Sequence, residues 1–314
     1  MTHKETSACF FAIGKEIYLW HPLLGEPHVV ATRPDIVTSL SQCYGYSGNF
    51  TILDGCIDGK IRCDLTNRVL ASFSLPVMGM MPFYKDHCAF NEKQKGQLFK
   101  DKDDALLVAL EKQSSIYSFC NLQEEEIASV DHCQEHIQMA PAYNSFCWVS
   151  GWQSVYRGFG RKTVDGSYLA TNIILAPYGS ENFLVVHYHN ESDHPQGITV
   201  SDRDQKILAT WDWQDFGFAQ GAGVYFLADR PHILILTSRS ITIKDKYHSK
   251  SGNLVRIISI ELRPPTGQTP TPRVIAEDVY EYYPWLDGTN PFLSIDVREA
   301  KRKLSISTLL KEEF

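Results

Sequence analysis

Long apolar runs and blocks of like charge are both missing from this sequence. It contains no stretch of about 18 apolar residues, the length that a helix needs to cross a bilayer. Acidic and basic residues are interspersed along a chain of formal net charge −7, so no nucleic-acid-binding arm is indicated. Before Lys15 only six consecutive residues are apolar, too few for the core of a signal peptide. We expect a cytoplasmic protein with no membrane span and no nucleic-acid partner.

The short motifs that hold cofactors or build nucleophiles are missing as well. The sequence has no P-loop, no dinucleotide-binding G-x-G-x-x-G and no H-E-x-x-H. Gly45-Tyr46-Ser47-Gly48 is one residue short of a nucleophile elbow and is interpreted as a hairpin turn, because Gly and Ser favour turns. The eight cysteines include no C-x-x-C pair and are interpreted as reduced, small apolar side chains. No cofactor is predicted.

Helical periodicity is scarce, and short strand-like segments take its place. The pieces are four to nine residues long, rich in Val, Ile, Tyr, Phe and Trp, and separated by turn residues. The segment 103–112 could pass for an amphipathic helix, but its place between neighbouring strands favours a strand. With 314 residues, 43% of them hydrophobic, the chain can bury a large core. These features predict an all-β protein.

A short signature recurs six times: two residues that are mostly apolar, then Ala, then a small or polar residue. Its alanines are separated by 40, 57, 42, 39 and 67 residues. About 40 residues are needed for four short strands with their turns, the size of one blade of a β-propeller. The six copies are Val29-Val30-Ala31-Thr32, Val69-Leu70-Ala71-Ser72, Glu126-Ile127-Ala128-Ser129, Tyr168-Leu169-Ala170-Thr171, Ile207-Leu208-Ala209-Thr210 and Val274-Ile275-Ala276-Glu277.

The spacing predicts one propeller domain over residues 1–314, made of four-stranded antiparallel meanders. The two long intervals are expected to hold insertions, at 88–104 and 244–272, where Lys, Gly, Ser and Pro are frequent. The first unit supplies three strands, and the last supplies three more, from VYEYYPW, PFLSIDV and KLSISTL. Seven blades are the simplest count. Six blades result if strands from the two termini share one closing sheet, which would leave no open edge in the ring.

The residues around Tyr283-Pro284-Trp285-Leu286-Asp287-Gly288 carry a resemblance to a known family. This Pro, aromatic and Asp-Gly pattern, together with the strand EIYLW, the Gly25-Glu26-Pro27 turn and the Val-Ala-Thr that follows, resembles the TolB and tricorn-protease class of WD-repeat-like propellers. The resemblance spans nearly the whole chain through short motifs. It implies a propeller that serves as a binding platform, or as a gating domain of a serine peptidase whose catalytic half is not found in this sequence.

Two kinds of residue could bring chemistry to such a ring. His187 and His189 are two apart on a predicted strand and therefore share a face. With His194 or Asp193 as a third ligand they could bind a metal ion that activates water. The interpretation that we favour is a strand that ends in a polar loop with ordinary surface histidines. Asp35, Asp54, Asp215 and Asp287 lie near predicted turns and could supply a carboxylate pair, although turn formation accounts for such residues too.

Aromatic residues near strand ends are the candidate partner-binding residues. Tyr and Trp combine a large apolar contact with a polar tip, as in interface hot spots, and we select Tyr143, Trp148, Tyr178, Tyr283 and Trp285. The leading hypothesis is a non-enzymatic platform, a scaffold or adaptor, for a protein or peptide partner. The alternatives are a hydrolase or lyase with a small, metal-assisted site at the central mouth, and a carbohydrate-binding propeller.

Overall fold

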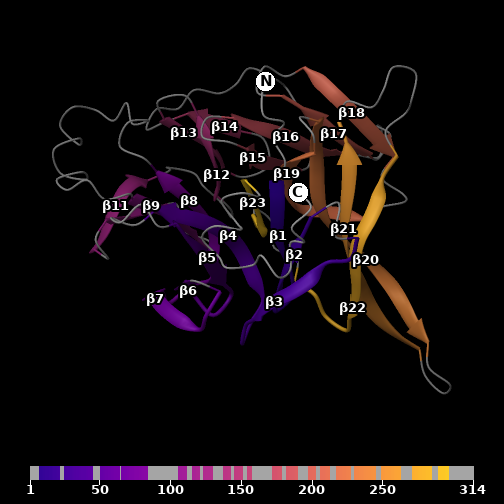
Figure 1. Ribbon diagram of the computed structural model, residues 1–314, viewed down its shortest axis with the longest axis horizontal. Coiled ribbons are helices and arrows are strands. Elements are labelled where there is room, and N and C mark those ends of the chain that lie inside the picture. Colours follow the sequence, from indigo (N-terminus) through magenta and orange to yellow (C-terminus); the bar gives the residue numbers. More distant parts are fainter. Residues whose placement is uncertain are drawn as a thin grey trace.

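The protein is built of β-strands, as the sequence predicts. In the computed structural model every regular element of the described residues is a strand, and none is a helix. Figure 1 shows these strands gathered into several sheets. The structure describes residues 7–21, 25–44, 50–63, 65–83, 105–111, 115–120, 123–129, 137–142, 145–150, 154–157, 172–178, 182–189, 197–202, 206–212, 217–227, 230–244, 249–262, 271–284 and 289–296.

The described strands form antiparallel sheets in which neighbours along the chain are neighbours in space. One sheet, sheet B, has the order β4 (Val37–Tyr44), β5 (Phe50–Cys56), β6 (Lys60–Cys63) and β7 (Arg68–Ser72). Sheet C has the order β8 (Val77–Phe83), β9 (Ala105–Leu110), β10 (Ser115–Cys120) and β11 (Gln123–Ser129). Sheet D has β12 (Ile137–Ala142), β13 (Ser145–Ser150) and β14 (Ser154–Arg157). Sheets B and C are the four-stranded meanders that the sequence predicts, and sheet D is a meander described over three strands.

Two further sheets follow the same plan. Sheet E has the order β15 (Asn172–Tyr178), β16 (Asn182–His189), β17 (Gly197–Ser201) and β18 (Ile207–Asp212). Sheet F has β19 (Phe218–Leu227), β20 (Arg230–Lys244), β21 (Ser249–Glu261) and β22 (Arg273–Tyr280). The segment 103–112 contains β9, which confirms that this part of the chain is a strand.

The two ends of the chain share a sheet. Sheet A has the order β23 (Phe292–Asp296), β1 (Ser7–Ile13), β2 (Glu16–Trp20) and β3 (His28–Thr32). Strand β23 pairs antiparallel with β1 in a register that runs from Ser7 opposite Asp296 to Phe11 opposite Phe292. This is the arrangement that the six-blade alternative requires at the termini.

The expected strand at 279–285 is not formed. Val279 and Tyr280 complete β22, and residues 281–284 have no strand structure. Of the three terminal strands expected from the sequence, the one at PFLSIDV is present as β23, whereas KLSISTL lies outside the described residues.

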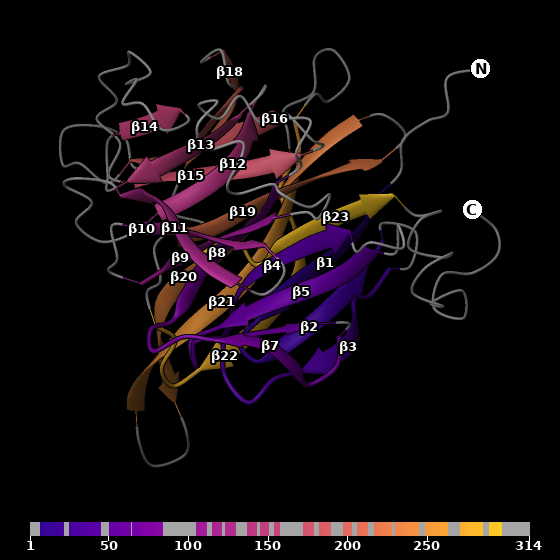
Figure 2. The ribbon, with the colours of Figure 1, turned by 90° about the vertical axis from the view of Figure 1, so that its left-hand side faces the viewer.

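The first strand of each sheet contacts the first strands of two other sheets. These contacts join β4 to β8, β8 to β12, β12 to β15, β15 to β19, β19 to β23 and β23 to β4. Figure 2 shows β4, β8, β19 and β23 running side by side through the middle of the molecule. The first strands of the sheets therefore lie together, and the later strands of each sheet extend outward from them.

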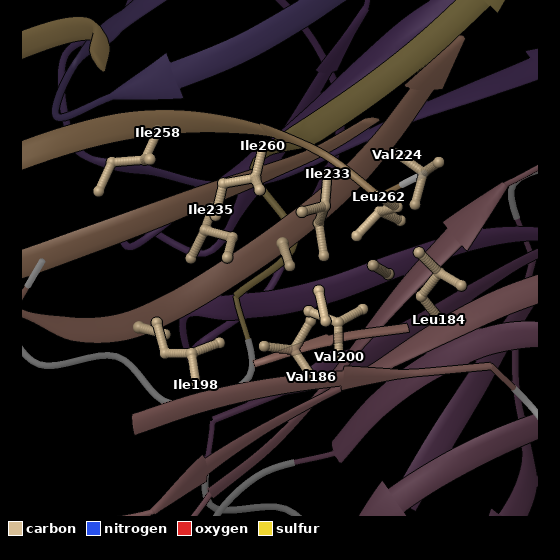
Figure 3. Close-up of a cluster of buried hydrophobic side chains, with 14 of the residues drawn as sticks. Leu184, Val186, Ile198, Val200, Val224, Ile233, Ile235, Ile258, Ile260 and Leu262 are labelled. Atoms are coloured by element: carbon tan, nitrogen blue, oxygen red, sulfur yellow. The ribbon is translucent and has the colours of Figure 1, made fainter. Parts of the chain in front are cut away.

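Hydrophobic side chains fill the spaces between neighbouring sheets. One cluster joins sheets E and F through Val186, Val200, Ile233 and Ile260, all at most 2% exposed; Figure 3 shows these side chains facing one another across the gap. Other clusters join sheet A to sheet B, sheet A to sheet F, and sheet B to sheet C. Because both faces of a sheet are buried, many strands consist of consecutive apolar residues instead of alternating apolar and polar ones.

The Ala signature marks the last strand of its sheet. Five of the six copies lie in β3, β7, β11, β18 and β22, and the copy at 168–171 lies outside the described residues. In each of the five, the register with the preceding strand shifts just before the Ala, so that one residue is left without an opposite neighbour. The repeat is thus a β-bulge, a device that twists an edge strand and discourages pairing with other molecules. The bulged residues are Val30, Leu70, Ile127, Leu208 and Ile275.

The two expected insertions have different outcomes. The range 88–104 lies outside the described residues. The range 244–272 contains β21, which pairs with β20 over thirteen residues from His232 opposite Glu261 to Lys244 opposite Ser249. The described part of this range is therefore mainly β21, one strand of a long hairpin. Within the described part of the chain there is no helix of the length and hydrophobicity that a membrane crossing requires.

Candidate interaction surface

At the bulges whose side chains are described, one aliphatic side chain turns inward and the one before it is exposed. The bulged residue turns inward: Ile275 is 8% exposed, and Val30, Leu70 and Leu208 pack against the buried clusters. The residue before it turns outward, although it is also aliphatic. The exposed fractions are 50% for Val29, 44% for Val69, 65% for Ile207 and 46% for Val274. We call these four residues the rim aliphatics.

A two-stranded ribbon extends sheet F beyond its neighbours. Strand β19 pairs with β20 only as far as Ser238, whereas β20 and β21 stay paired through residues 239–244 and 249–254. Six residues of strand span about 20 Å. Figures 1 and 2 both show the far ends of β20 and β21 projecting past the other sheets. We refer to residues 239–244 and 249–254 as the ribbon.

The two faces of the ribbon differ in polarity. Because side chains alternate along a strand, and directly opposite residues share a face, the register assigns each residue to one side. One face continues the side of sheet F that packs on sheet E, and it carries Ile241, Ile243 and Leu254, with Val279 of β22 beside them. Lys250, opposite Ile243, and Arg239, opposite Leu254, lie on this same face. The other face carries Ser240, Thr242, Lys244, Ser249, Ser251 and Asn253.

The apolar face of the ribbon is only partly covered. Ile241, Ile243 and Leu254 are each partly exposed, and Val279 is 48% exposed. A Cβ on Gly252 would lie 2.2 Å from the Ile243 side chain, so the glycine gives this isoleucine room to lie flat on the ribbon. None of the four apolar residues belongs to the buried clusters between the sheets.

Charged residues border this face. Arg256 Nε donates to Glu277 Oε2 at 3.0 Å, and Lys250 pairs with Glu281, which lowers the pKa of that carboxyl. Arg239 lies in the row of Leu254 and Val279, and its Nε is buried without a hydrogen-bond partner. A guanidinium donor with an unmet hydrogen bond is costly, so this position favours an incoming acceptor.

Of the predicted partner-binding aromatics, Tyr283 is the one whose side chain is described, and it is part of the core. It is 6% exposed, its ring lies 5.1 Å from that of Tyr280, and burial raises its pKa to about 12. Tyr283 therefore does not present its ring to a partner. For Trp148 and Tyr178 the structure describes the backbone in β13 and β15, whereas Tyr143 and Trp285 lie outside the described residues.

The structure places His187 and His189 on β16, two residues apart. They stand opposite Thr199 and Gly197 of β17, so the backbone gives both the same face, as the sequence predicts. His194 lies outside the described residues. Among the residues that the structure describes, no group of three His, Cys, Asp or Glu side chains could hold a metal ion. The metal site stays a prediction.

The candidate carboxylates have structural partners where they are described. Asp54 is fully buried within β5, not at a turn, and accepts two hydrogen bonds from Arg33 at 2.6 and 2.8 Å. Asp35 accepts a hydrogen bond from the backbone N–H of Ile36, as a turn-forming Asp does. Asp215 and Asp287 lie outside the described residues.

The ribbon is the feature that the sequence interpretation missed. Residues 240–244 read Ser-Ile-Thr-Ile-Lys, a clean alternation that indicates an amphipathic strand. The polar residues that follow it, from residue 244 on, indicated a loop instead. The exposure of the rim aliphatics was not predictable either, because it depends on the bulge and not on residue type.

Comparison with known proteins gives no family assignment. No family model matches the chain, and no curated protein matches its sequence. Among solved structures it is similar to BBS1N in complex with ARL6DN, soaked with lead, at a TM-score of 0.45 and 11% identity over 84% of this chain and 79% of that chain. The same complex soaked with mercury matches at a TM-score of 0.45 and 12% identity, over 83% and 76% of the two chains.

Proposed function

We propose that this chain is a non-enzymatic platform that binds a protein or peptide partner. The observation that carries the proposal is the set of rim aliphatics, which are held outward at equivalent positions of four sheets. Isolated exposed aliphatics are ordinary. A repeated outward position, next to a bulge that protects the strand edge from non-specific pairing, is better explained by a surface kept apolar for a partner.

The scaffold that we propose is one six-bladed propeller formed by the whole chain, of the WD-repeat-like kind. Two observations support it: the first strands of the sheets contact one another in a closed series, and β23 pairs with β1 in a shared sheet. A ring of this kind leaves only short edges exposed. It would hold the outer strands rigidly, which lowers the entropic cost of binding through them.

The test is capture of a partner by the tagged full-length chain from its native cells. We expect a stoichiometric protein that also co-elutes with the purified chain in size-exclusion chromatography. A rim variant with Val29→Thr, Val69→Thr, Ile207→Thr and Val274→Thr keeps β-branched residues in the strands and should lose most of this partner. The matched control exchanges two exposed polar residues of the same strands, Thr32→Ser and Ser72→Thr.

Two results would contradict the proposal. If the wild-type chain elutes alone and captures no stoichiometric protein, it is not a platform of this kind. If the rim variant retains as much partner as the polar control, the rim aliphatics are not the surface used.

A further inference from the structure

The ribbon has an apolar face that extends beyond the sheets on either side of sheet F. The alternation of residues 240–244 puts Ile241 and Ile243 on one side and the polar residues on the other. An isolated hairpin of this kind is marginally stable in water, and an amphipathic pair of strands gains stability when its apolar side is covered. The ribbon therefore gains stability if another protein segment covers its apolar face.

We propose that the apolar face of the ribbon docks an extended segment of a protein partner that carries aliphatic side chains and a carboxylate. The inference rests on the proposed platform function and names the surface and the chemistry of the partner. Ile241, Ile243, Leu254 and Val279 form the apolar contact, and they lie in adjacent rows of three neighbouring strands.

The carboxylate is specified by Arg239. Its Nε is buried and has no hydrogen-bond partner, and it stands at the border of the apolar face beside Leu254. The other basic residues of this face, Arg256 and Lys250, already pair with Glu277 and Glu281. Among the described residues Arg239 is thus the basic residue of this face that has no carboxylate partner, and a carboxylate is the acceptor that a guanidinium binds best.

The extended form of the partner follows from the edge of β20. In the described part of the chain no strand pairs with β20 beyond Ser238 on the side where β19 ends. Its backbone N–H and C=O groups at 239–244 can therefore pair with an added strand, which would place alternate side chains on the apolar face.

The test is selection of a phage-displayed library of random peptides on the immobilised full-length chain. We expect the enriched peptides to contain aliphatic residues together with Asp or Glu. An Ile241→Thr, Ile243→Thr variant keeps the strand propensity and should bind a synthetic copy of the enriched peptide about tenfold more weakly or worse. The control, Ser240→Thr with Thr242→Ser on the polar face, should bind it as the wild type does.

Arg239 is tested separately. Selection on Arg239→Gln should still enrich aliphatic residues but should no longer enrich Asp and Glu. Circular dichroism and thermal unfolding of every variant show that the fold is retained, because the ribbon lies outside the buried clusters.

Three outcomes would overturn the inference. They are equal enrichment on the wild type and on the isoleucine variant, enrichment of basic peptides, and self-association of the chain that the isoleucine variant abolishes. Capture of a partner from cells distinguishes failure of the ribbon inference from failure of the proposed platform function. If the rim variant loses the partner but the isoleucine variant keeps it, only docking on the ribbon is refuted. If the wild-type chain captures no partner, both proposals are refuted.

Discussion

A buried ion pair fixes the crossing from sheet A to sheet B. Arg33 follows β3, and its guanidinium donates to both oxygens of Asp54 in β5, with side chains that are 1% and 0% exposed. The backbone N–H of Arg33 also donates to the carbonyl of Lys15 at 2.7 Å. Removing water from two charges is costly, and the bidentate geometry offsets this cost only while both partners are present.

Breaking this pair should destabilise the protein strongly. We expect Arg33→Met or Asp54→Leu alone to lower the free energy of unfolding by about 3–5 kcal/mol, because each leaves an uncompensated buried charge. The double variant should recover most of the loss. The measurement is urea unfolding of all three variants, with Lys250→Met as a control, because its ion pair with Glu281 is exposed to solvent and should contribute little to stability. Additive losses in the double variant would show that the two residues do not act as a pair.

At the scale of elements, the approach of β19 to β23 depends on small residues. Gly223 of β19 lies against Phe292 of β23, and a Cβ added to the glycine would lie 2.4 Å from the Phe292 Cβ. Gly221 is similarly close to Pro291 and to the carbonyl oxygen of Thr289. The glycines of this strand therefore allow sheets F and A to meet at their first strands.

A methyl group at residue 223 should force these strands apart. We expect Gly223→Ala to lower the free energy of unfolding by about 1–3 kcal/mol, the usual cost of overpacking, whereas Ala222→Gly on the same strand should cost about 1 kcal/mol or less. Thermal unfolding of the two variants measures the difference. A Gly223→Ala protein as stable as the wild type would mean that β23 shifts freely and does not pack closely on β19.

The positions of most described strands were predictable from the sequence, because the local residue pattern determines them. The exposure of individual side chains was less predictable, because contacts between sheets determine it. The Ala signature marks the last strands in five sheets because the same bulge recurs just before each Ala. The exposure of Val69 depends on the bulge in β7, and the burial of Tyr283 depends on strands such as β1 and β2 that lie far away in the sequence. Asp54 looks like a turn residue, and only the proximity of Arg33 makes it part of the core. The ribbon was missed because its polar end resembles a loop.

At the scale of the whole molecule, one pair of strands joins segments from near the two ends of the chain. Cys9 of β1 stands directly opposite Ser294 of β23, and the two side chains are hydrogen-bonded. Burial raises the pKa of the Cys9 thiol, which makes it unreactive in the folded protein. A second thiol at residue 294 would therefore stand opposite the native one across the paired strands.

A disulfide at this position should lock the two ends together. In Ser294→Cys, an added oxidant such as diamide takes up the two thiol hydrogens as the S–S bond forms with Cys9. Because the bond closes nearly the whole chain, it can add up to about 5 kcal/mol, and we expect Tm to rise by about 5 °C or more relative to the reduced form. Peptide mapping under non-reducing conditions identifies the bond, and Ser294→Ala controls for oxidation at other cysteines. Because the buried Cys9 thiol is unreactive in the folded protein, diamide is added while the urea-unfolded variant refolds. If the refolded protein carries no bond between residues 9 and 294, β1 and β23 are not paired in solution.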